Sequence, residues 1–341
     1  MAEKNYTFKD FKSDQQVRWC PGCGNHAILA ALQRAMPEVC KGLSYDLETF
    51  VMVSGIGCSS RLPYYLNTFG FHGIHGRATA ISTGIKVANP KLTVWQTCGD
   101  GDALAIGGNH FIHAIRRNID INILLFNNQI YGLTKGQYSP TSKRGTISKT
   151  SPYGTVEHPF NPGSLVIGAK GTFFARGLDV EMKLNEEIMV AAARHDGASV
   201  CEMLTNCVIF NDGAHKNISE AETRDDRVIR LKHGEKMIFG KNRDKGLVLD
   251  GLSLKVVKIG ENGVTEDDIL GHDSHTDNIG IHFMLAEMKY PDFPVALGVI
   301  RDVADFTYDD GVRDQVEEVK AKSKITCLQD LLESGSTWEV K

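Results

Sequence analysis

Two strand-like runs in the first half of the chain end in polar residues, and a helix-like stretch joins them. Residues 93–99 lead into Asp100-Gly101-Asp102, and residues 121–126 lead into Asn127-Asn128, with a helical pattern at 103–118 between them. A strand, a helix and a second strand in this order predict two parallel strands of one sheet. The carboxyl ends of such strands lie at one edge, where open α/β sheets bind ligands. The chain is therefore predicted to be an α/β protein with a ligand site at that edge.

The residues at these two strand ends suit a divalent metal that holds a diphosphate. Mg²⁺ prefers hard oxygen ligands and shares its coordination sphere with phosphate oxygens and water. The Asp100 carboxylate, the Asn128 amide oxygen and the Ile130 carbonyl are the candidate ligands. The spacing of GDG and NN matches the motif of thiamine-diphosphate enzymes, which the chain resembles at this point. The alternative is two unrelated turns, because glycine and asparagine are ordinary turn residues. A dinucleotide-binding GxGxxG loop is excluded, because Leu104 stands where it requires glycine.

The composition is that of a globular protein and excludes several classes of partner. The 341 residues are 42% hydrophobic and 23% charged, with a net charge of −4, so nothing basic points to nucleic acid. Apolar stretches fall short of the roughly 18 residues that a membrane span needs. Residues 1–10 are polar and lack the apolar core of a signal peptide. We therefore expect a cytoplasmic protein that binds neither nucleic acid nor membrane.

Eight cysteines are present, and in a cytoplasmic chain they favour metal ligands or buried thiols over disulfides. Cys20 and Cys23 form a Cys-Pro-Gly-Cys turn, which places two sulfur atoms on one side of a tight loop. The segment before it is too polar for the buried strand of a thioredoxin-like redox pair, and structural zinc would want a second close pair. A [4Fe–4S] cluster tolerates dispersed thiolates and is compatible. Cys58, in a glycine-rich turn, and Cys207 both follow predicted strands.

Five segments of the chain, in order, resemble one family closely. They are WCPGCG, GIGCSS, HGIHGRATAISTGIKVANP, GDGDALAIGGNHFIHAIRRN and NNQIYGLTKGQYSPTS. Together they are similar to the β-subunit of 2-oxoacid:ferredoxin oxidoreductases, enzymes that use thiamine diphosphate, an iron–sulfur cluster and coenzyme A. The resemblance covers residues from about 18 to 210 and is much weaker over 211–341.

The resemblance implies ligands for each cofactor. One [4Fe–4S] cluster is implied to have four cysteine ligands: Cys20, Cys23, Cys58 and Cys207. The implied ligands of Mg²⁺ are the same Asp100, Asn128 and Ile130 carbonyl. Contacts with thiamine diphosphate are implied for four short segments: Ile56, Gly57, Cys58, Ser59, His75, Gly76, Arg77, Ala78, Gly101, Asp102, Gly132 and Leu133. Cys58 would then touch both the cluster and thiamine diphosphate, which gives electrons a short path.

Two cations near these motifs are candidates for substrate recognition. Arg61 lies in the same turn as Cys58, and Lys135 follows the Gly132-Leu133 turn. A dicarboxylic substrate such as 2-oxoglutarate needs a cation for its far carboxylate. In the family that the chain resembles, a lysine at position 135 favours 2-oxoglutarate over pyruvate. The alternatives are that both are solvated surface cations, and that the substrate is pyruvate or a branched-chain 2-oxoacid. A non-redox thiamine-diphosphate enzyme is a further alternative, which the cysteines disfavour.

One requirement of thiamine catalysis is missing, a glutamate that protonates the aminopyrimidine, and no catalytic residue is therefore assigned to this chain. The resemblance implies an α-subunit that carries the pyrimidine-binding domain and this glutamate, in an (αβ)2 assembly. It implies a reaction of 2-oxoglutarate, coenzyme A and oxidised ferredoxin to succinyl-CoA, CO2 and reduced ferredoxin, or its reverse. Ferredoxin is an external partner, because the sequence lacks the C-x₂-C-x₂-C run of a ferredoxin.

Alternating helix and strand patterns predict a mostly parallel sheet with helices on both faces, and the resemblance implies the diphosphate-binding domain of thiamine enzymes. Helices are predicted at 25–36, 77–88, 103–118 and 180–195, and strands at 50–54, 92–97, 121–127, 171–176 and 198–204. Residues 138–164, rich in Pro, Ser, Thr and Gly, are predicted to form a long active-site loop. After residue 210 the pattern loosens. We therefore expect a thiamine-diphosphate- and [4Fe–4S]-binding domain at 1–210 and an extension at 211–341 that packs on the core or the partner subunit.

Overall fold

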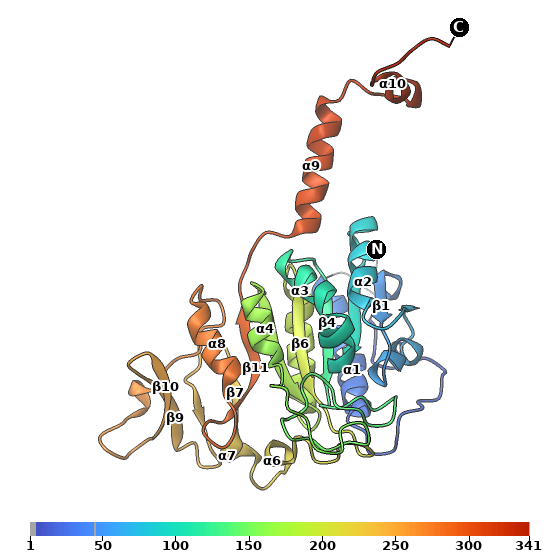
Figure 1. Ribbon diagram of the computed structural model, residues 1–341. Coiled ribbons are helices and arrows are strands. Elements are labelled where there is room, and N and C mark those ends of the chain that lie inside the picture. The colour runs from blue at the N-terminus through green and yellow to red at the C-terminus, as the bar shows by residue number, and fades with distance from the viewer. Residues whose placement is uncertain (1–4, 44–45, 341) are drawn as a thin grey trace.

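A mostly parallel β-sheet of eight strands forms the centre of the protein (Figure 1). The computed structural model describes residues 5–43 and 46–340. The strands of this sheet are β1 (Phe50–Ser54), β2 (Phe69–His72), β3 (Thr93–Gly99), β4 (Asn122–Asn127), β5 (Phe173–Leu178), β6 (Ser199–Leu204), β7 (Val228–Leu231) and β11 (Val295–Asp302). Their order is β2-β1-β3-β4-β6-β5-β11-β7. The pairing of β11 with β5 is antiparallel and the other described pairs of this sheet are parallel, which confirms the predicted fold class.

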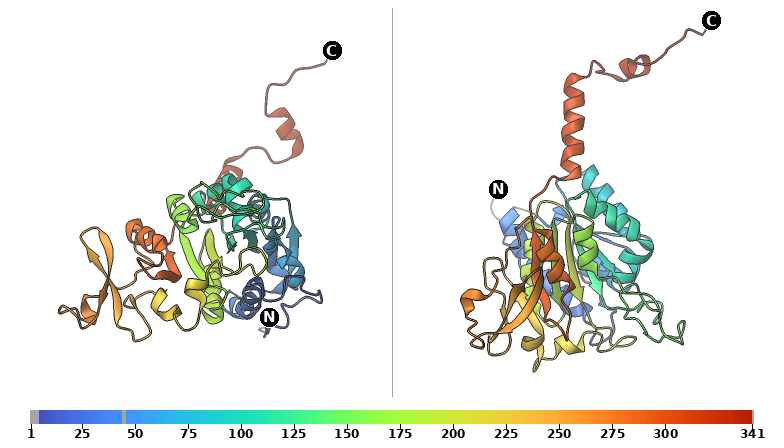
Figure 2. Two further views of the ribbon diagram at one scale, coloured as in Figure 1. Left: turned by 60° about the horizontal axis from the view of Figure 1, so that its bottom comes forward. Right: turned by 60° about the vertical axis from the view of Figure 1, so that its left-hand side comes forward.

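Helices cover both faces of this sheet, as Figure 2 shows. They are α1 (Asn25–Leu43), α2 (Ala78–Ala88), α3 (Gly108–Arg116), α4 (Pro162–Gly168), α5 (Met182–Arg194) and α8 (Ile279–Glu287). Helices α1 and α5 pack together on one face, and the others lie on the opposite face. Alternate side chains of a strand point to opposite faces, so Phe50 and Met52 of β1 join the first core, whereas Val51 and Val53 join the second. Burial on both faces explains why the parallel strands are continuous apolar runs in the sequence.

The helix predicted at 103–118 is interrupted near its start. Residues Asp102–Ile106 form a π-helical turn, and α3 begins only at Gly108. Gly107 permits this turn, because a Cβ there would overlap the Asp102 carbonyl. Turns of this kind are frequent at functional sites, and this one directly follows Asp100 at the end of β3. The irregular segment therefore belongs to the ligand-binding edge of the sheet.

Residues after 210 add β7 and β11 to the main sheet and form a small second sheet. Three antiparallel strands make this second sheet: β8 (Ile238–Phe239), β9 (Lys245–Asp250) and β10 (Ser253–Lys258). The remaining short elements are α6 (Lys216–Ser219), α7 (Arg224–Arg227), α10 (Leu328–Glu333) and 3₁₀ turns at Leu47–Thr49, Ser59–Tyr65 and Glu266–Asp268. Helix α9 (Tyr308–Lys322) extends away from the sheet in Figures 1 and 2, on the side opposite the loop that follows β4. Within the described parts of the chain, none of the helices is long and apolar enough to cross a membrane.

Three buried polar side chains fasten β11 to the segments around it, and we name His272, His282 and Arg301 the histidine junction. Arg301 donates its Nε to the Gly171 carbonyl at 2.9 Å, and its Nη1 lies 3.0 Å from His282 Nδ1. His282 Nε2 is 3.0 Å from the Asp273 carbonyl, and His272 Nε2 is 2.8 Å from a carbonyl of β11. Burial lowers the pKa of both histidines below the ordinary value of 6.5. The junction is therefore built from neutral imidazoles.

Candidate functional site

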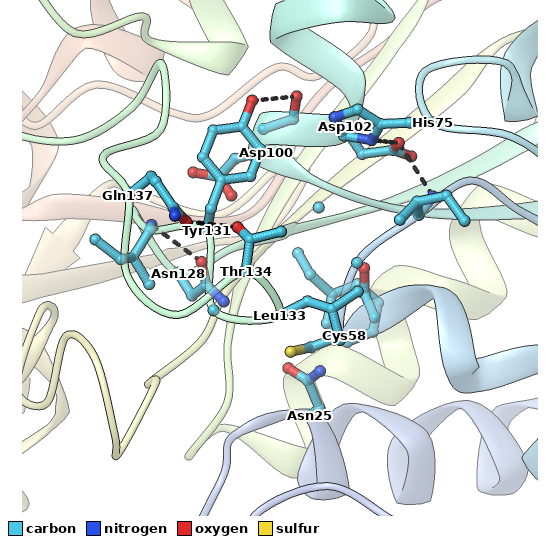
Figure 3. Close-up of a pocket in the computed structure, with 18 residues that line it drawn as sticks. Asn25, Cys58, His75, Asp100, Asp102, Asn128, Tyr131, Leu133, Thr134 and Gln137 are labelled. Atoms are coloured by element: carbon cyan, nitrogen blue, oxygen red, sulfur yellow. Dashed lines mark hydrogen bonds and ion pairs between the residues drawn. The ribbon is translucent and has the colours of Figure 1, made fainter. Parts of the chain in front are cut away.

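A cavity of about 490 Å³ lies at the carboxyl ends of β1, β3 and β4 (Figure 3). It brings together most of the residues expected to hold thiamine diphosphate and Mg²⁺: Ile56, Gly57, Cys58, Ser59, His75, Asp100, Gly101, Asp102, Asn128, Ile130, Gly132 and Leu133. Three further expected residues, Gly76, Arg77 and Ala78, are not part of its described lining. Arg77 is exposed and Ala78 is buried, and the Gly76 amide donates to Asp102 Oδ1 at 2.7 Å. We refer to this cavity as the cofactor pocket.

The carboxylate of Asp100 is buried at the wall of the cofactor pocket, with 2% of the residue exposed. Its Oδ2 accepts hydrogen bonds from the hydroxyls of Ser139, at 2.5 Å, and Thr141. Burial raises the pKa of Asp100 to about 6, although these two hydroxyls oppose the shift. Neither lysine nor arginine is among the described residues that line the pocket. A buried carboxylate without a cationic neighbour is costly, so a bound metal cation fits this wall.

The second and third candidate metal ligands lie in a tight loop after β4. Asn128 Oδ1 accepts a hydrogen bond from the Ile130 amide at 3.1 Å. The loop is closed by a hydrogen bond from the Tyr131 amide to the Gln137 carbonyl at 2.9 Å. The Tyr131 hydroxyl donates to the Gly101 carbonyl at 3.0 Å, and a Cβ at Gly101 would overlap the tyrosine ring. This contact holds the loop against the end of β3, so that carboxylate, amide and main-chain oxygens line one pocket.

Asp102 ties the opposite wall of the pocket together. Its Oδ1 accepts hydrogen bonds from His75 Nδ1 at 2.6 Å, the Ile56 amide at 3.1 Å and the Gly76 amide at 2.7 Å. Figure 3 shows the His75–Asp102 pair across the pocket from Asn128. Since the Asp102 oxygen serves three donors of the protein, we assign it to holding the loops after β1 and β2. Because His75 Nδ1 is hydrogen-bonded to the Asp102 carboxylate, its Nε2 can form a hydrogen bond with another group.

A serine hydroxyl in the pocket has unused hydrogen-bonding capacity. The Oγ of Ser59 is buried and has no hydrogen-bond partner among the described residues, and Ser59 lines the pocket. Buried hydroxyls without a partner are uncommon in native proteins. A phosphate oxygen in the pocket would satisfy it. The donors and oxygen ligands present therefore fit Mg²⁺ and a diphosphate.

The four cysteines expected to bind iron line a second cavity, of about 190 Å³: Cys20, Cys23, Cys58 and Cys207. A Cβ at Gly132 would lie 3.5 Å from the sulfur atoms of both Cys58 and Cys207, so these two sulfurs flank the glycine. Burial, with smaller contributions from the neighbouring thiols, raises the pKa of Cys23 to about 11. We name this space the cysteine cavity.

The cysteine cavity offers four thiols around an open space, the ligand type that an iron–sulfur cluster requires. Within the described ranges, no three His, Cys, Asp or Glu side chains converge closely enough to hold one metal ion. A [4Fe–4S] cluster separates its thiolates by the width of the cluster, so four cysteines around an open space meet its requirement. Cys58, Asn128, Gly132 and Leu133 line both the cysteine cavity and the cofactor pocket. The two spaces therefore share a wall.

The two candidate substrate cations occupy different surroundings. Arg61 lines the cysteine cavity and an adjoining cavity of about 400 Å³, which also contains Arg18 and His72. Ile56, Gly57 and Leu133 line both this adjoining cavity and the cofactor pocket. Lys135 is exposed, has a φ of 77°, and is not in the described lining of these cavities. The structure therefore places Arg61, and not Lys135, beside the cofactor pocket.

Several residues that line the pocket or support Asp100 were not identified from the sequence: Asn25, Tyr131, Thr134 and Gln137 in the lining, and Ser139 and Thr141 behind Asp100. Tyr131, Thr134 and Gln137 belong to the motif segment that follows Asn128, so the motif could have identified them as pocket residues. Ser139 and Thr141 reach Asp100 from the long loop after β4, and nothing in the local sequence specifies this tertiary contact. Asn25 directly follows the Cys-Pro-Gly-Cys turn, at the start of α1.

Comparisons with known proteins agree with this geometry. Residues 55–203 match the family described as thiamine pyrophosphate enzyme, C-terminal TPP binding domain. The chain is 48% identical over 335 residues to 2-oxoglutarate oxidoreductase subunit KorB of Mycobacterium tuberculosis, covering 97% of this chain and 88% of the relative. It is 46% identical over 222 residues to subunit beta of 2-oxoacid:ferredoxin oxidoreductase 1 of Aeropyrum pernix, covering 65% and 67% of the two chains.

A solved structure resembles the whole chain. It is a 2-oxoglutarate:ferredoxin oxidoreductase from Magnetococcus marinus with 2-oxoglutarate, coenzyme A and succinyl-CoA bound. The match has a TM-score of 0.76 and 31% identity, and covers 98% of this chain and 97% of that chain.

Proposed function

The chain belongs to the β-subunits of 2-oxoacid:ferredoxin oxidoreductases, and we propose that it serves a 2-oxoglutarate:ferredoxin oxidoreductase. The reaction converts 2-oxoglutarate, coenzyme A and oxidised ferredoxin to succinyl-CoA, CO2 and reduced ferredoxin, or runs in reverse. The relatives named KorB and the Magnetococcus marinus enzyme support 2-oxoglutarate as the substrate.

The observation that carries this proposal is the wall shared by the cofactor pocket and the cysteine cavity. Cys58 and Gly132 line both spaces. When bound, thiamine diphosphate supplies an electron sink for decarboxylation, and a [4Fe–4S] cluster supplies a one-electron carrier. An enzyme that only decarboxylates has no use for four cysteines beside this pocket. The arrangement therefore supports an oxidative reaction.

Each wall of the pocket has a separate task in this proposal. Asp100, Asn128 and the Ile130 carbonyl hold Mg²⁺, and Ser59 donates a hydrogen bond to the diphosphate. Asp102 keeps the loops after β1 and β2 in place and orients His75. Cys20, Cys23, Cys58 and Cys207 hold the cluster, with Cys58 nearest the cofactor pocket among these four because it lines both spaces.

The chain supplies half of the active site. No glutamate is among the described residues that line the cofactor pocket, and we assign this group to the pyrimidine-binding domain of an α-subunit. In this proposal residues 1–210 carry the cofactors, residues 211–341 pack on the core or the α-subunit, and the assembly is (αβ)2. Ferredoxin collects the electrons, and the complex works in the cytoplasm.

The test is an assay of the complex purified anaerobically with its α-subunit. We expect ferredoxin reduction that requires both 2-oxoglutarate and coenzyme A, together with iron, Mg²⁺ and thiamine diphosphate in the protein. Faster turnover of pyruvate or a branched-chain 2-oxoacid would overturn the substrate assignment. Decarboxylation without ferredoxin reduction would overturn the redox assignment.

Substrate recognition is tested at the two cations. We assign Arg61 to the far carboxylate of 2-oxoglutarate because it lies beside the cofactor pocket, and Lys135 stays a second candidate cation. Arg61→Ala and Lys135→Ala should each raise KM for 2-oxoglutarate more than KM for pyruvate. Lys91→Ala is the matched control, since Lys91 is exposed before the start of β3, at the opposite edge of the sheet. Equal changes for both substrates would reject the carboxylate assignment.

A further inference from the structure

The long loop after β4 contains a self-supported arm, residues 143–157. The Gly145 amide donates to the Thr155 carbonyl at 2.8 Å, and the Thr155 amide donates to the Thr146 carbonyl at 3.1 Å. Gly145 and Gly154 both have positive φ, and a Cβ at Gly154 would lie 3.0 Å from the Gly145 carbonyl oxygen. A Cβ at Gly154 would therefore crowd the opposite side of the arm, whereas Gly145 is favoured only by its positive φ, since a Cβ there would meet open space. Its shape is set by its own main chain.

The tip of the arm presents large apolar side chains to solvent. Ile147 is 74% exposed, Tyr153 100% and Val156 79%. The arm carries the cations Lys143, Arg144 and Lys149 and one acidic residue, Glu157, which accepts a hydrogen bond from the Tyr138 hydroxyl. Exposed apolar side chains on one segment, flanked mainly by basic residues, are typical of a protein interface.

The base of the arm reaches the metal-binding wall. Ser139 and Thr141, just before the arm, are buried and donate to Asp100. Thr141 Oγ1 also lies 3.0 Å from Asn127 Oδ1, and Ser142 Oγ donates to the Gln129 carbonyl at 2.6 Å. A single segment thus connects the exposed apolar tip with the buried carboxylate.

The position of the arm indicates what covers it. The arm follows β4, and it therefore lies at the edge of the sheet where the cofactor pocket lies. Helix α9 leaves from the opposite edge (Figure 1). Ile56 and Leu133 in the pocket lining are 36% and 42% exposed, so the pocket itself is open. On the proposed function, the α-subunit must reach this edge to supply its glutamate.

We propose that the 143–157 arm is a docking surface for the α-subunit, which approaches the edge of the sheet where Ser139 and Thr141 contact Asp100. The partner surface has an apolar recess for Tyr153 with acidic groups around it. This inference rests on the proposed function, because the need for an α-subunit at this edge comes from that function.

The experiment compares two sets of substitutions in the full chain co-expressed with its α-subunit. The arm variant carries Ile147→Ser, Tyr153→Ser and Val156→Ser. The matched control carries Val87→Ser, at an exposed apolar side chain in the last turn of α2, which lies next to the start of β3 at the opposite edge of the sheet. We expect the arm variant to bind the α-subunit about 100-fold more weakly, because a buried aromatic anchor dominates interfaces of this kind. The control should bind like the natural chain.

Two further measurements keep the outcomes distinct. Amide exchange at 145–155 should slow when the α-subunit is added to the natural chain, and the arm variant should keep its melting temperature and iron content. Unchanged α-subunit affinity in the arm variant would overturn the inference. An arm variant that loses only the association between β-subunits would overturn it as well. The 2-oxoglutarate activity of the natural complex is measured beside them. An inactive natural complex defeats the proposed function, whereas an active complex with an unaffected arm variant defeats only this inference.

Discussion

The cofactor pocket and the histidine junction both bury polar side chains, but they use them differently. In the junction, Arg301, His272 and His282 find their partners within the chain. In the pocket, Ser59 Oγ lacks a partner among the described residues, and the buried carboxylate of Asp100 lacks a lysine or arginine in the described lining. Burying polar groups costs free energy in both regions. Of the two, only the pocket has polar atoms that a ligand could still bind. Unused capacity, rather than burial alone, distinguishes a site from a structural network.

The largest effect is expected in the cysteine cavity, where a single substitution should remove iron without unfolding the protein. Cys58→Ser should abolish iron binding and the visible absorption of the anaerobic protein, because a serine hydroxyl is a poor iron ligand. The exposed Cys327 supplies the control, and Cys327→Ser should keep its iron. Iron content and the absorption spectrum measure both. A fully loaded Cys58→Ser protein would remove Cys58 from the ligand set.

The second prediction separates ligand binding from stability at Asp100. Asp100→Asn should weaken Mg²⁺-dependent binding of thiamine diphosphate about 100-fold, the range seen when a metal site loses a charged partner. The cofactor-free protein should become more stable at pH 7 by about 2 kcal/mol, because burial raises the pKa to about 6 and the ionised native carboxylate is therefore costly. Calorimetric titration and urea unfolding measure the two effects.

The control for Asp100→Asn is Asp250→Asn, at an exposed carboxylate in β9. It should change neither quantity measurably, because exposed ion pairs contribute little. A loss of stability in cofactor-free Asp100→Asn would mean that this carboxylate is structural, like the junction.

The reverse pattern is expected at the histidine junction. Arg301→Met leaves the Gly171 carbonyl and His282 Nδ1 without their donor, which should lower the free energy of unfolding by about 3 kcal/mol. Cofactor affinity, measured below the unfolding temperature, should stay unchanged. Arg313→Met, at an exposed pair with Asp310, should cost less than about 0.5 kcal/mol. Weakened cofactor binding in Arg301→Met would erase the contrast between the two regions.

The smallest effect is a pH dependence of the junction. His272 and His282 have folded-state pKa values below the ordinary 6.5, so the unfolded chain takes up protons first as the pH falls below 6.5. The free energy of unfolding should therefore have its full value above pH 6.5. Below that pH it should decrease, by up to about 1.4 kcal/mol per pH unit for each histidine. His272→Gln should flatten this slope in urea titrations, whereas His158→Gln, at an exposed position, should not. A slope unaffected by His272→Gln would place the titration elsewhere.

The parallel core was predictable from the sequence because both of its faces are buried. Strands β1, β4 and β6 were predicted within a residue of their observed bounds, since each is a continuous apolar run. The exposed β2, the small sheet and the antiparallel β11 were missed. Strand β2 is an edge strand whose residues are exposed, so it carries no burial pattern. Register and direction of β11 depend on its neighbour β5, which local sequence does not encode.

The site was predicted where motif and chemistry coincide. Asp100, Asn128 and the four cysteines surround the spaces expected of them. Asp102 was expected beside thiamine diphosphate, and the structure shows in addition that it fastens two loops. The Ser139 and Thr141 contacts with Asp100 come from the far side of a loop. Such contacts depend on the tertiary fold, and no spacing rule reveals them.

The indole of Trp19 donates a hydrogen bond to the Cys58 carbonyl at 2.6 Å and is buried. The chain has three tryptophans; Trp95 lies in the core, and Trp338 is 84% exposed. An indole in contact with a ligand of an absorbing iron–sulfur centre transfers its excitation to that centre, while a solvated indole keeps its emission at longer wavelength. On the proposed function, the short-wavelength emission should therefore fall as iron and sulfide enter the cysteine cavity, with the emission of Trp338 as the internal reference.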